Sequence, residues 1–96
     1  MKRHNDQQIK DVLKEMVETY RLRSKLNQTK IKSLWVELMG SSIARHTTDI
    51  KIRGKKLYVS INSSSLKQEL SMGKEKIKNI INEQLGEEFI DEVVIR

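Results

Sequence analysis

Residues 48–61 read TDIKIRGKKLYVSI, and this stretch decides the fold. On both sides of Gly54-Lys55, apolar and polar residues alternate with the period of two that is typical of β-strands. A two-residue turn with glycine first pairs Arg53 with Lys56, and the pairing then continues outward from the turn. In this register the apolar residues share one face, and a slip of one residue would mix the faces. The stretch therefore predicts a β-hairpin that buries Ile50, Ile52, Leu57, Val59 and Ile61 and exposes Lys51, Arg53, Lys56 and Tyr58.

Two helices are expected before the hairpin. Over residues 6–22 the apolar residues recur at the spacing of one helix face, and Asp6 is a candidate N-cap. A short basic linker over residues 21–26 is expected next. Asn27 then resembles the N-cap of a second helix, whose apolar stripe is Ile31, Leu34, Trp35, Leu38 and Met39. Gly40 favours a left-handed helix end, with room for one further turn over residues 41–45.

Two more helices and a strand are expected after the hairpin. Ser65 and Gln68 have the spacing of a capping box, Gly73 separates the helices, and Gly86 ends the second. Residues 89–95 then alternate like a strand that joins the hairpin. The order α-α-β-β-α-α-β predicts an α+β, KH-like fold, with a three-stranded sheet covered on one face by helices. We expect a single domain over residues 1–96, with a helical, basic part over residues 1–45 and the remaining elements over residues 46–96.

Charge and composition restrict the class of protein. The 96 residues carry a net charge of +6, of which +5 falls within residues 1–34, and this bias indicates a phosphate-rich or acidic partner. There is no cysteine and no apolar run of about 18 residues, and the first residues lack a signal-peptide core. We expect a cytoplasmic protein that does not enter a membrane.

The sequence offers no recognisable catalytic centre. The two histidines, His4 and His46, have no acidic residue at metal-ligand spacing, and the neighbouring acids Glu87-Glu88 are typical of a solvated loop. Gly73-Lys74 lacks the rest of a Walker motif, and no Gly-x-x-Gly loop of the KH type is present. We expect no enzymatic activity, no metal, no cofactor and no small-molecule substrate.

Two groups of cations are candidates for binding nucleic acid. The open face of the hairpin combines cations with an aromatic ring, a mixture that suits single-stranded nucleic acid; its members are Lys51, Arg53, Lys55, Lys56 and Tyr58. The expected linker supplies Arg21, Arg23 and Lys25, continued by Lys30 and Lys32. In each case the alternative is a solvated surface, and lysines on strands also discourage aggregation between sheet edges.

Trp35 is the candidate for contact with a protein partner. Its place in a helical stripe favours a core role, whereas tryptophan at an exposed position is often a hot spot of an interface. The sequence leaves both roles open.

An ordered series of short motifs resembles one bacterial family. The motifs are Leu34-Trp35, Gly40, IARHT at residues 43–47, IRGKKLYV at 52–59, SSSLKQEL at 63–70 and IINEQLG at 80–86. In this order they are similar to the DciA-like proteins, also known as domain-of-unknown-function family 721, over residues 5–96. Many relatives have a proline after the His-Thr pair, where this chain has Thr48-Asp49.

The resemblance implies a KH-like fold and a role in bacterial chromosome replication. DciA-like proteins load or operate the DnaB-type replicative helicase, bind DNA including single-stranded DNA, and depend on the helicase for ATP hydrolysis. Trp35 matches the tryptophan that the family ties to helicase interaction. Two alternatives stay open from the sequence, namely an RNA- or ribosome-associated protein and an adaptor that binds only proteins.

Overall fold

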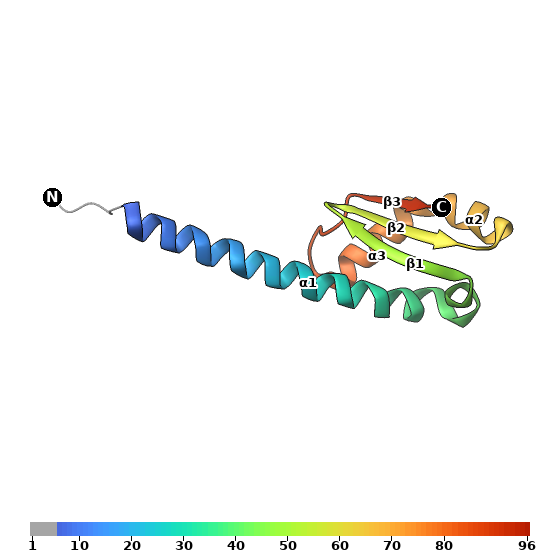
Figure 1. Cartoon of the computed structure of the whole chain (residues 1–96). Helices are drawn as coiled ribbons and strands as arrows, with labels where there is room; N and C mark the ends of the chain where they lie inside the picture. The colour runs from blue at the N-terminus through green and yellow to red at the C-terminus, as the bar shows by residue number, and fades with distance from the viewer. Residues whose placement is uncertain (1–5) are drawn as a thin grey trace.

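A long helix leads into a small α+β body in the computed structural model, which describes residues 6–96 (Figure 1). The elements are α1 (Asp6–Arg45), β1 (Thr47–Arg53), β2 (Lys56–Ile61), α2 (Ser64–Ser71), α3 (Lys74–Leu85) and β3 (Glu92–Ile95). The sheet order is β1-β2-β3, with β1 antiparallel and β3 parallel to the central strand β2. Helices pack on one face of this sheet, so the predicted α+β class and three-stranded sheet are confirmed. His4 lies outside the described residues.

The β1–β2 hairpin has the predicted register. Arg53 pairs with Lys56, and the pairing continues to Ile50 and Val59. Gly54 has a φ of 59°, whereas Lys55, like every other non-glycine residue of the described chain, does not have a positive φ. This is the geometry of a two-residue turn in which only the first residue is left-handed. The three apolar residues of β2 are buried as predicted. Because β1 is an edge strand, its Ile50 and Ile52 are half-buried rather than fully buried.

The prediction of two N-terminal helices with a linker between them is wrong. Residues 6–45 form the single element α1, and residues 21–26 are helical. The interval contains neither glycine nor proline, and its Leu, Arg and Lys residues are good helix formers. Asn27 is therefore not an N-cap, because its side chain is buried within the helix, where Nδ2 donates a hydrogen bond of 3.2 Å to Glu87 Oε2.

Gly40 interrupts the regular geometry of α1 near its end. Its φ of 85° and ψ of 169° lie outside the helical region, and a left-handed φ of this kind favours glycine. One further helical turn follows and ends at Arg45, as the sequence predicted. The chain then turns at His46 into β1, so that the edge strand runs back along the second half of α1 (Figure 1).

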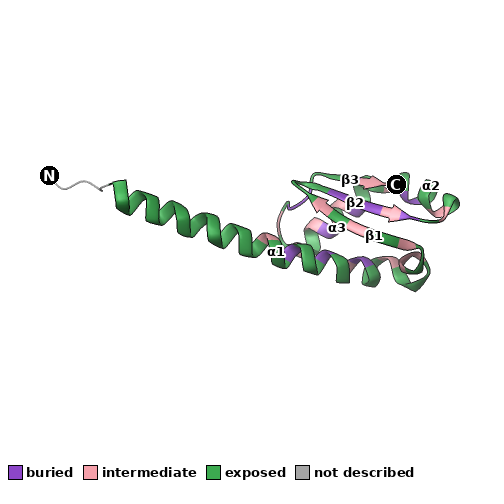
Figure 2. Ribbon diagram, in the orientation of Figure 1, coloured by how far each residue is buried: buried purple, intermediate pink, exposed green. Residues whose placement is uncertain are grey.

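The core lies between the helices and the covered face of the sheet (Figure 2). Six side chains are almost completely inaccessible to solvent, namely Ile31, Trp35, Leu57, Val59, Ile81 and Ile90. Only the second half of α1 contributes to this core, because the buried residues of the helix begin at Asn27. The first half therefore projects from the body, and the molecule measures 67 × 20 × 19 Å.

Side chains and glycines define the remaining element ends. The N-cap of α2 is Ser63, whose hydroxyl accepts a hydrogen bond from the Leu66 amide at 3.4 Å, and not Ser65 as the capping-box spacing suggested. Gly86 ends α3 with a φ of 76°, as predicted. The loop that follows is held by Asn82, which accepts from the amides of Phe89 and Ile90 at 3.0 Å and donates to the Ile90 carbonyl at 2.7 Å. This loop delivers β3 to the edge of β2.

Candidate nucleic-acid interface

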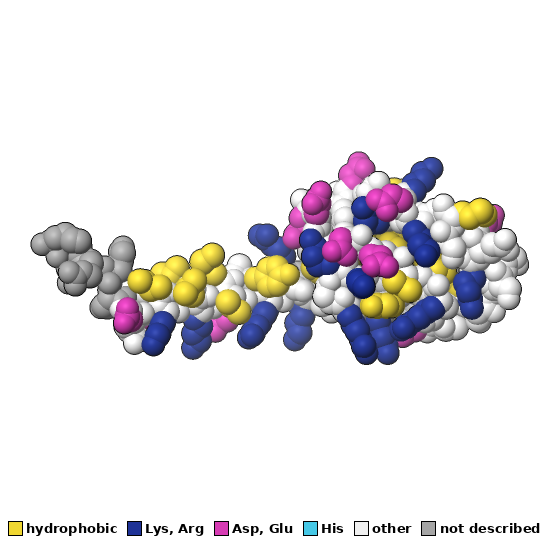
Figure 3. Space-filling model, turned by 90° about the horizontal axis from the view of Figure 1, so that it is seen from above, with side chains coloured by type: hydrophobic (Ala, Val, Ile, Leu, Met, Phe, Trp, Pro, Cys, Tyr) yellow, Lys and Arg dark blue, Asp and Glu magenta, His cyan; other side chains and the backbone are white. Residues whose placement is uncertain are grey.

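A row of exposed cations follows one side of α1. We call the row the basic ridge, and its members are Lys10, Lys14, Arg21, Lys25 and Lys32. At 3.6 residues per turn these five side chains fall within about 60° of the helix circumference. The row covers about 33 Å at 1.5 Å per residue. Figure 3 shows such a line of Lys and Arg side chains along one side of the projecting helix, with hydrophobic side chains on the other side.

The continuous helix divides the cations that the sequence grouped as a linker. Arg21 and Lys25 belong to the basic ridge. Arg23 lies about 200° around the helix from Arg21, on the opposite side, and Lys30 lies with Arg23. Nothing in the sequence pattern separates these residues unless the helix is known to be unbroken. The basic ridge therefore retains two of the three predicted linker residues and adds Lys10 and Lys14, which the sequence analysis did not select.

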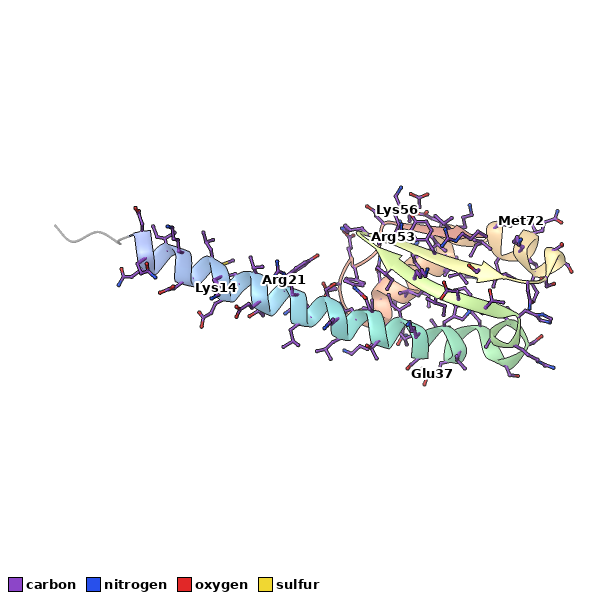
Figure 4. The ribbon with its side chains drawn as sticks, in the orientation of Figure 1. Lys14, Arg21, Glu37, Arg53, Lys56 and Met72 are labelled. Carbon is purple, nitrogen blue, oxygen red and sulfur yellow. The ribbon has the colours of Figure 1, made fainter. Side chains whose placement is uncertain are left out.

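The open face of the hairpin brings the predicted cations together with acidic neighbours. Lys51 Nζ lies 3.7 Å from Asp49 Oδ2, and Lys56 Nζ lies 3.4 Å from Glu92 Oε1. Exposed pairs of this kind add little to stability, but each leaves less positive charge available to a ligand. Figure 4 shows Arg53 and Lys56 near the end of the hairpin, which points toward the projecting half of α1.

Tyr58 is less available for stacking than the sequence predicted. Its ring is half-buried rather than exposed, because the Arg96 guanidinium lies over it at 4.8 Å from the ring centroid. A base could reach the ring only by displacing this cation–π contact, which contributes about 0.5–1 kcal/mol at exposed sites. The ring and Arg96 together still present a flat cationic surface on the uncovered side of the sheet.

Lys55 lies at the border of an acidic region. Its carbonyl accepts a hydrogen bond from the Asp91 amide at 2.8 Å, and the residue lines a hollow with Glu83, Glu87, Glu88 and Asp91. In the same region the Glu75 carboxylate accepts a hydrogen bond of 2.6 Å from Lys78, which raises the pKa of the Lys78 ammonium, and Glu88 and Asp91 add to that shift. Four carboxylates therefore surround Lys55 and Lys78 on this side of the body.

The basic ridge continues onto the edge of the sheet away from the acidic region. Lys32 at its end lines a hollow of about 210 Å³ together with Gln28 of α1 and residues 50–53 of β1. Lys51 and Arg53 therefore stand beside the ridge, whereas Lys55 and Lys56 stand beside the acids. The five cations of α1 thus continue to Lys51 and Arg53 of β1 in one mainly basic surface, in which Asp49 neighbours Lys51 and Glu18 neighbours Arg21 and Lys25. Such a surface could follow the phosphates of a nucleic-acid backbone.

Trp35 is a core residue in this structure. It is 1% exposed, and its Nε1 donates a hydrogen bond of 2.9 Å to Thr47 Oγ1, which in turn donates to the Ile43 carbonyl. These bonds tie the second half of α1 to the start of β1. Of the two roles that the sequence leaves open for Trp35, the structure shows the core position and not the exposed one.

No other kind of site stands out within residues 6–96. In that range no three His, Cys, Asp or Glu side chains are grouped as metal ligands. His46 Nδ1 lies 2.8 Å from Asn62 Oδ1, and this contact lies at the junction between helix and strand. No described helix combines the length and the apolar character needed to cross a membrane.

Comparison with known proteins identifies one family. The family model described as "Dna[CI] antecedent, DciA" matches residues 8–95. The chain is also 35% identical, over 65 residues, to a UPF0232 protein of Corynebacterium glutamicum (strain R). That alignment covers 68% of this chain and 36% of the relative, so the match spans about a third of the relative's length. No solved structure matches the chain.

Proposed function

The chain belongs to the DciA family, and from this premise we propose that it binds both DNA and the DnaB-type replicative helicase and promotes loading of the helicase. Family membership supports the coarser statement, a loader-type accessory role in bacterial DNA replication. The finer proposal rests on the surface of seven cations formed by the basic ridge with Lys51 and Arg53. In this role the helicase supplies ATP hydrolysis, and the chain acts as a non-enzymatic binding protein.

DNA binding through the basic ridge should depend on which side of α1 a cation occupies. Replacing Arg21 and Lys25 by alanine should weaken binding to single-stranded DNA. It should also reduce the slope of log K against log salt concentration by about 1.4, because each lost phosphate contact accounts for about 0.7. Fluorescence anisotropy with labelled oligonucleotides at several salt concentrations measures both effects.

The matched control for that pair is Arg23→Ala with Lys30→Ala. This variant removes the same charge from the same helix, but from the opposite side. It should therefore leave most of the slope of log K against log salt concentration unchanged. On the hairpin, Lys51→Ala with Arg53→Ala should likewise weaken binding more than Lys55→Ala with Lys56→Ala. Equal losses within both matched pairs would mean that only net charge matters, and the proposed surface would be wrong.

Helicase binding is the second test of the proposed function. The full chain, mixed with the DnaB-type helicase of the same organism, should form a complex in size-exclusion chromatography and in calorimetric titration, and should increase the amount of helicase loaded on single-stranded DNA. The chain alone should hydrolyse no ATP. We propose that Trp35 supports this contact indirectly, by holding α1 on the sheet, since its side chain is buried. Absence of a complex with and without nucleotide, together with recovery of ribosomal proteins from lysate, would instead favour the ribosome-associated alternative.

A further inference from the structure

The projecting half of α1 exposes a continuous apolar stripe. Its six residues recur at helical spacing and are each between 46% and 65% exposed; they are Ile9, Val12, Leu13, Met16, Val17 and Tyr20. Within the described chain nothing packs on them, and Figure 3 shows them gathered on one side of the helix. A helix gains most of its stability from packing of its apolar face, so this stripe is suited to being covered.

The stripe lies on the same side of α1 as the residues that enter the core. At 3.6 residues per turn, Leu13 and Tyr20 align with Ile31, which is fully buried against the body. The face is therefore apolar along most of the helix, but the body covers it only from Asn27 onward. At this point the Asn27 side chain donates a hydrogen bond to Glu87. A second helix laid on the stripe would meet the body at this point.

We propose that the apolar stripe pairs with the same stripe of a second copy, with the two helices antiparallel. In a parallel pair the partner helix would run from the stripe into the space that the body occupies beside residues 27–35. An antiparallel pair avoids this clash, because each body lies beyond the N-terminal end of the other helix. A two-fold axis between residues 14 and 15 places Ile9 opposite the partner copy's Tyr20 and Leu13 opposite its Met16.

The size of the stripe fits a self-associating surface. Six large side chains, each about half exposed, offer roughly 600 Å² of apolar surface, so a symmetric pair buries at most roughly 1,200 Å², which reaches the lower limit of specific interfaces. Such an interface uses the same patch twice, as two-fold dimers do. Two charged residues, Asp6 and Arg23, border the stripe on the same side of α1. In the antiparallel register Asp6 stands opposite the partner copy's Arg23, so these opposite charges do not oppose close approach.

A lipid surface fits the same stripe less well. Helices that lie on membranes present a polar face rich in Lys and Arg. Residues 6–26 carry five cations but also four acids, namely Asp6, Asp11, Glu15 and Glu18, so that the segment has a net charge of only +1. The pairing uses only this chain and therefore stands or falls separately from the proposed helicase role.

The oligomeric state of the full chain tests the pairing. In sedimentation velocity the wild type should form dimers with a dissociation constant in the micromolar range, and Leu13→Asp should be monomeric. Leu22→Asp is the matched control, because Leu22 is equally apolar and 63% exposed but lies on the opposite side of α1. It should dimerise like the wild type. Circular dichroism confirms that each variant is folded.

Cysteine cross-linking tests the orientation, and the absence of native cysteine makes each introduced thiol unique. An oxidised mixture of Ile9→Cys and Tyr20→Cys chains should give the mixed disulfide dimer, whereas Ile9→Cys alone should cross-link slowly. Fast cross-linking of Ile9→Cys with itself would show a parallel pair and overturn the proposal. A wild type that stays monomeric overturns it as well; if Leu13→Asp then also loses helicase binding or vesicle binding, the stripe belongs to that partner.

Discussion

Replacing Trp35 by alanine should lower the free energy of unfolding by about 3–5 kcal/mol. The indole is 1% exposed, and its removal leaves a cavity between α1 and the sheet. The change also removes the donor to Thr47 Oγ1 and so releases one tie between α1 and β1. Domains of this size have total stabilities of about 5–15 kcal/mol, so the change removes a large fraction of the total and should lower the melting temperature. Urea denaturation followed by circular dichroism measures the change.

Val36→Ala is the control for Trp35→Ala, because Val36 is the next residue of α1 and is 54% exposed. Its effect should stay within about 0.5 kcal/mol. Trp35→Phe should fall between the two, since it keeps most of the volume but loses the hydrogen bond. A Trp35→Ala protein of unchanged stability that no longer binds the helicase would contradict the core role and make Trp35 a contact residue.

Asn82→Ala should cost about 2–4 kcal/mol, because two buried amides and one carbonyl lose their partner at once. The three bonds hold residues 86–91, and that loop positions both the buried Ile90 and the strand β3. Loss of the bonds should therefore also increase hydrogen exchange in β3, which mass spectrometry detects. Asn79→Ala, on an exposed position of the same helix, should be nearly neutral. Equal stability of the two variants would show that the loop holds its shape without Asn82.

The parts of the fold that were predictable are those with a strong local signal. The hairpin register followed from the alternation around Gly54, since only one register puts every apolar residue on one face. The end of α3 followed from Gly86, because glycine readily adopts the left-handed φ of a helix end. The continuity of α1 was missed because Asn27, read as a cap, lies on the apolar face of an unbroken helix. Its partner Glu87 is 60 residues away in the sequence, and no local pattern reveals that pairing.

The candidate site was predictable only in part for the same reason. The sequence pointed to Lys and Arg residues, but the side of α1 on which each of them lies can be assigned only when the helix is known to be continuous. The neighbours of the hairpin cations depend on tertiary structure: Glu92 comes from β3, and Lys32 comes from α1. Thus Lys51 and Arg53 could not be separated from Lys55 and Lys56 before the fold was known.

The parallel pairing of β3 with β2 has a consequence for how the chain folds. The hairpin joins residues only three positions apart, such as Arg53 and Lys56, so it can form within microseconds. By contrast, β3 must find β2 across 36 residues, as in the pair of Lys56 with Glu92. Closing that long loop has an entropic cost that delays the last step of folding. During synthesis, the edge of β2 therefore stays unpaired until residues 92–95 have left the ribosome, and in this interval the nascent chain is most open to pairing with other strands.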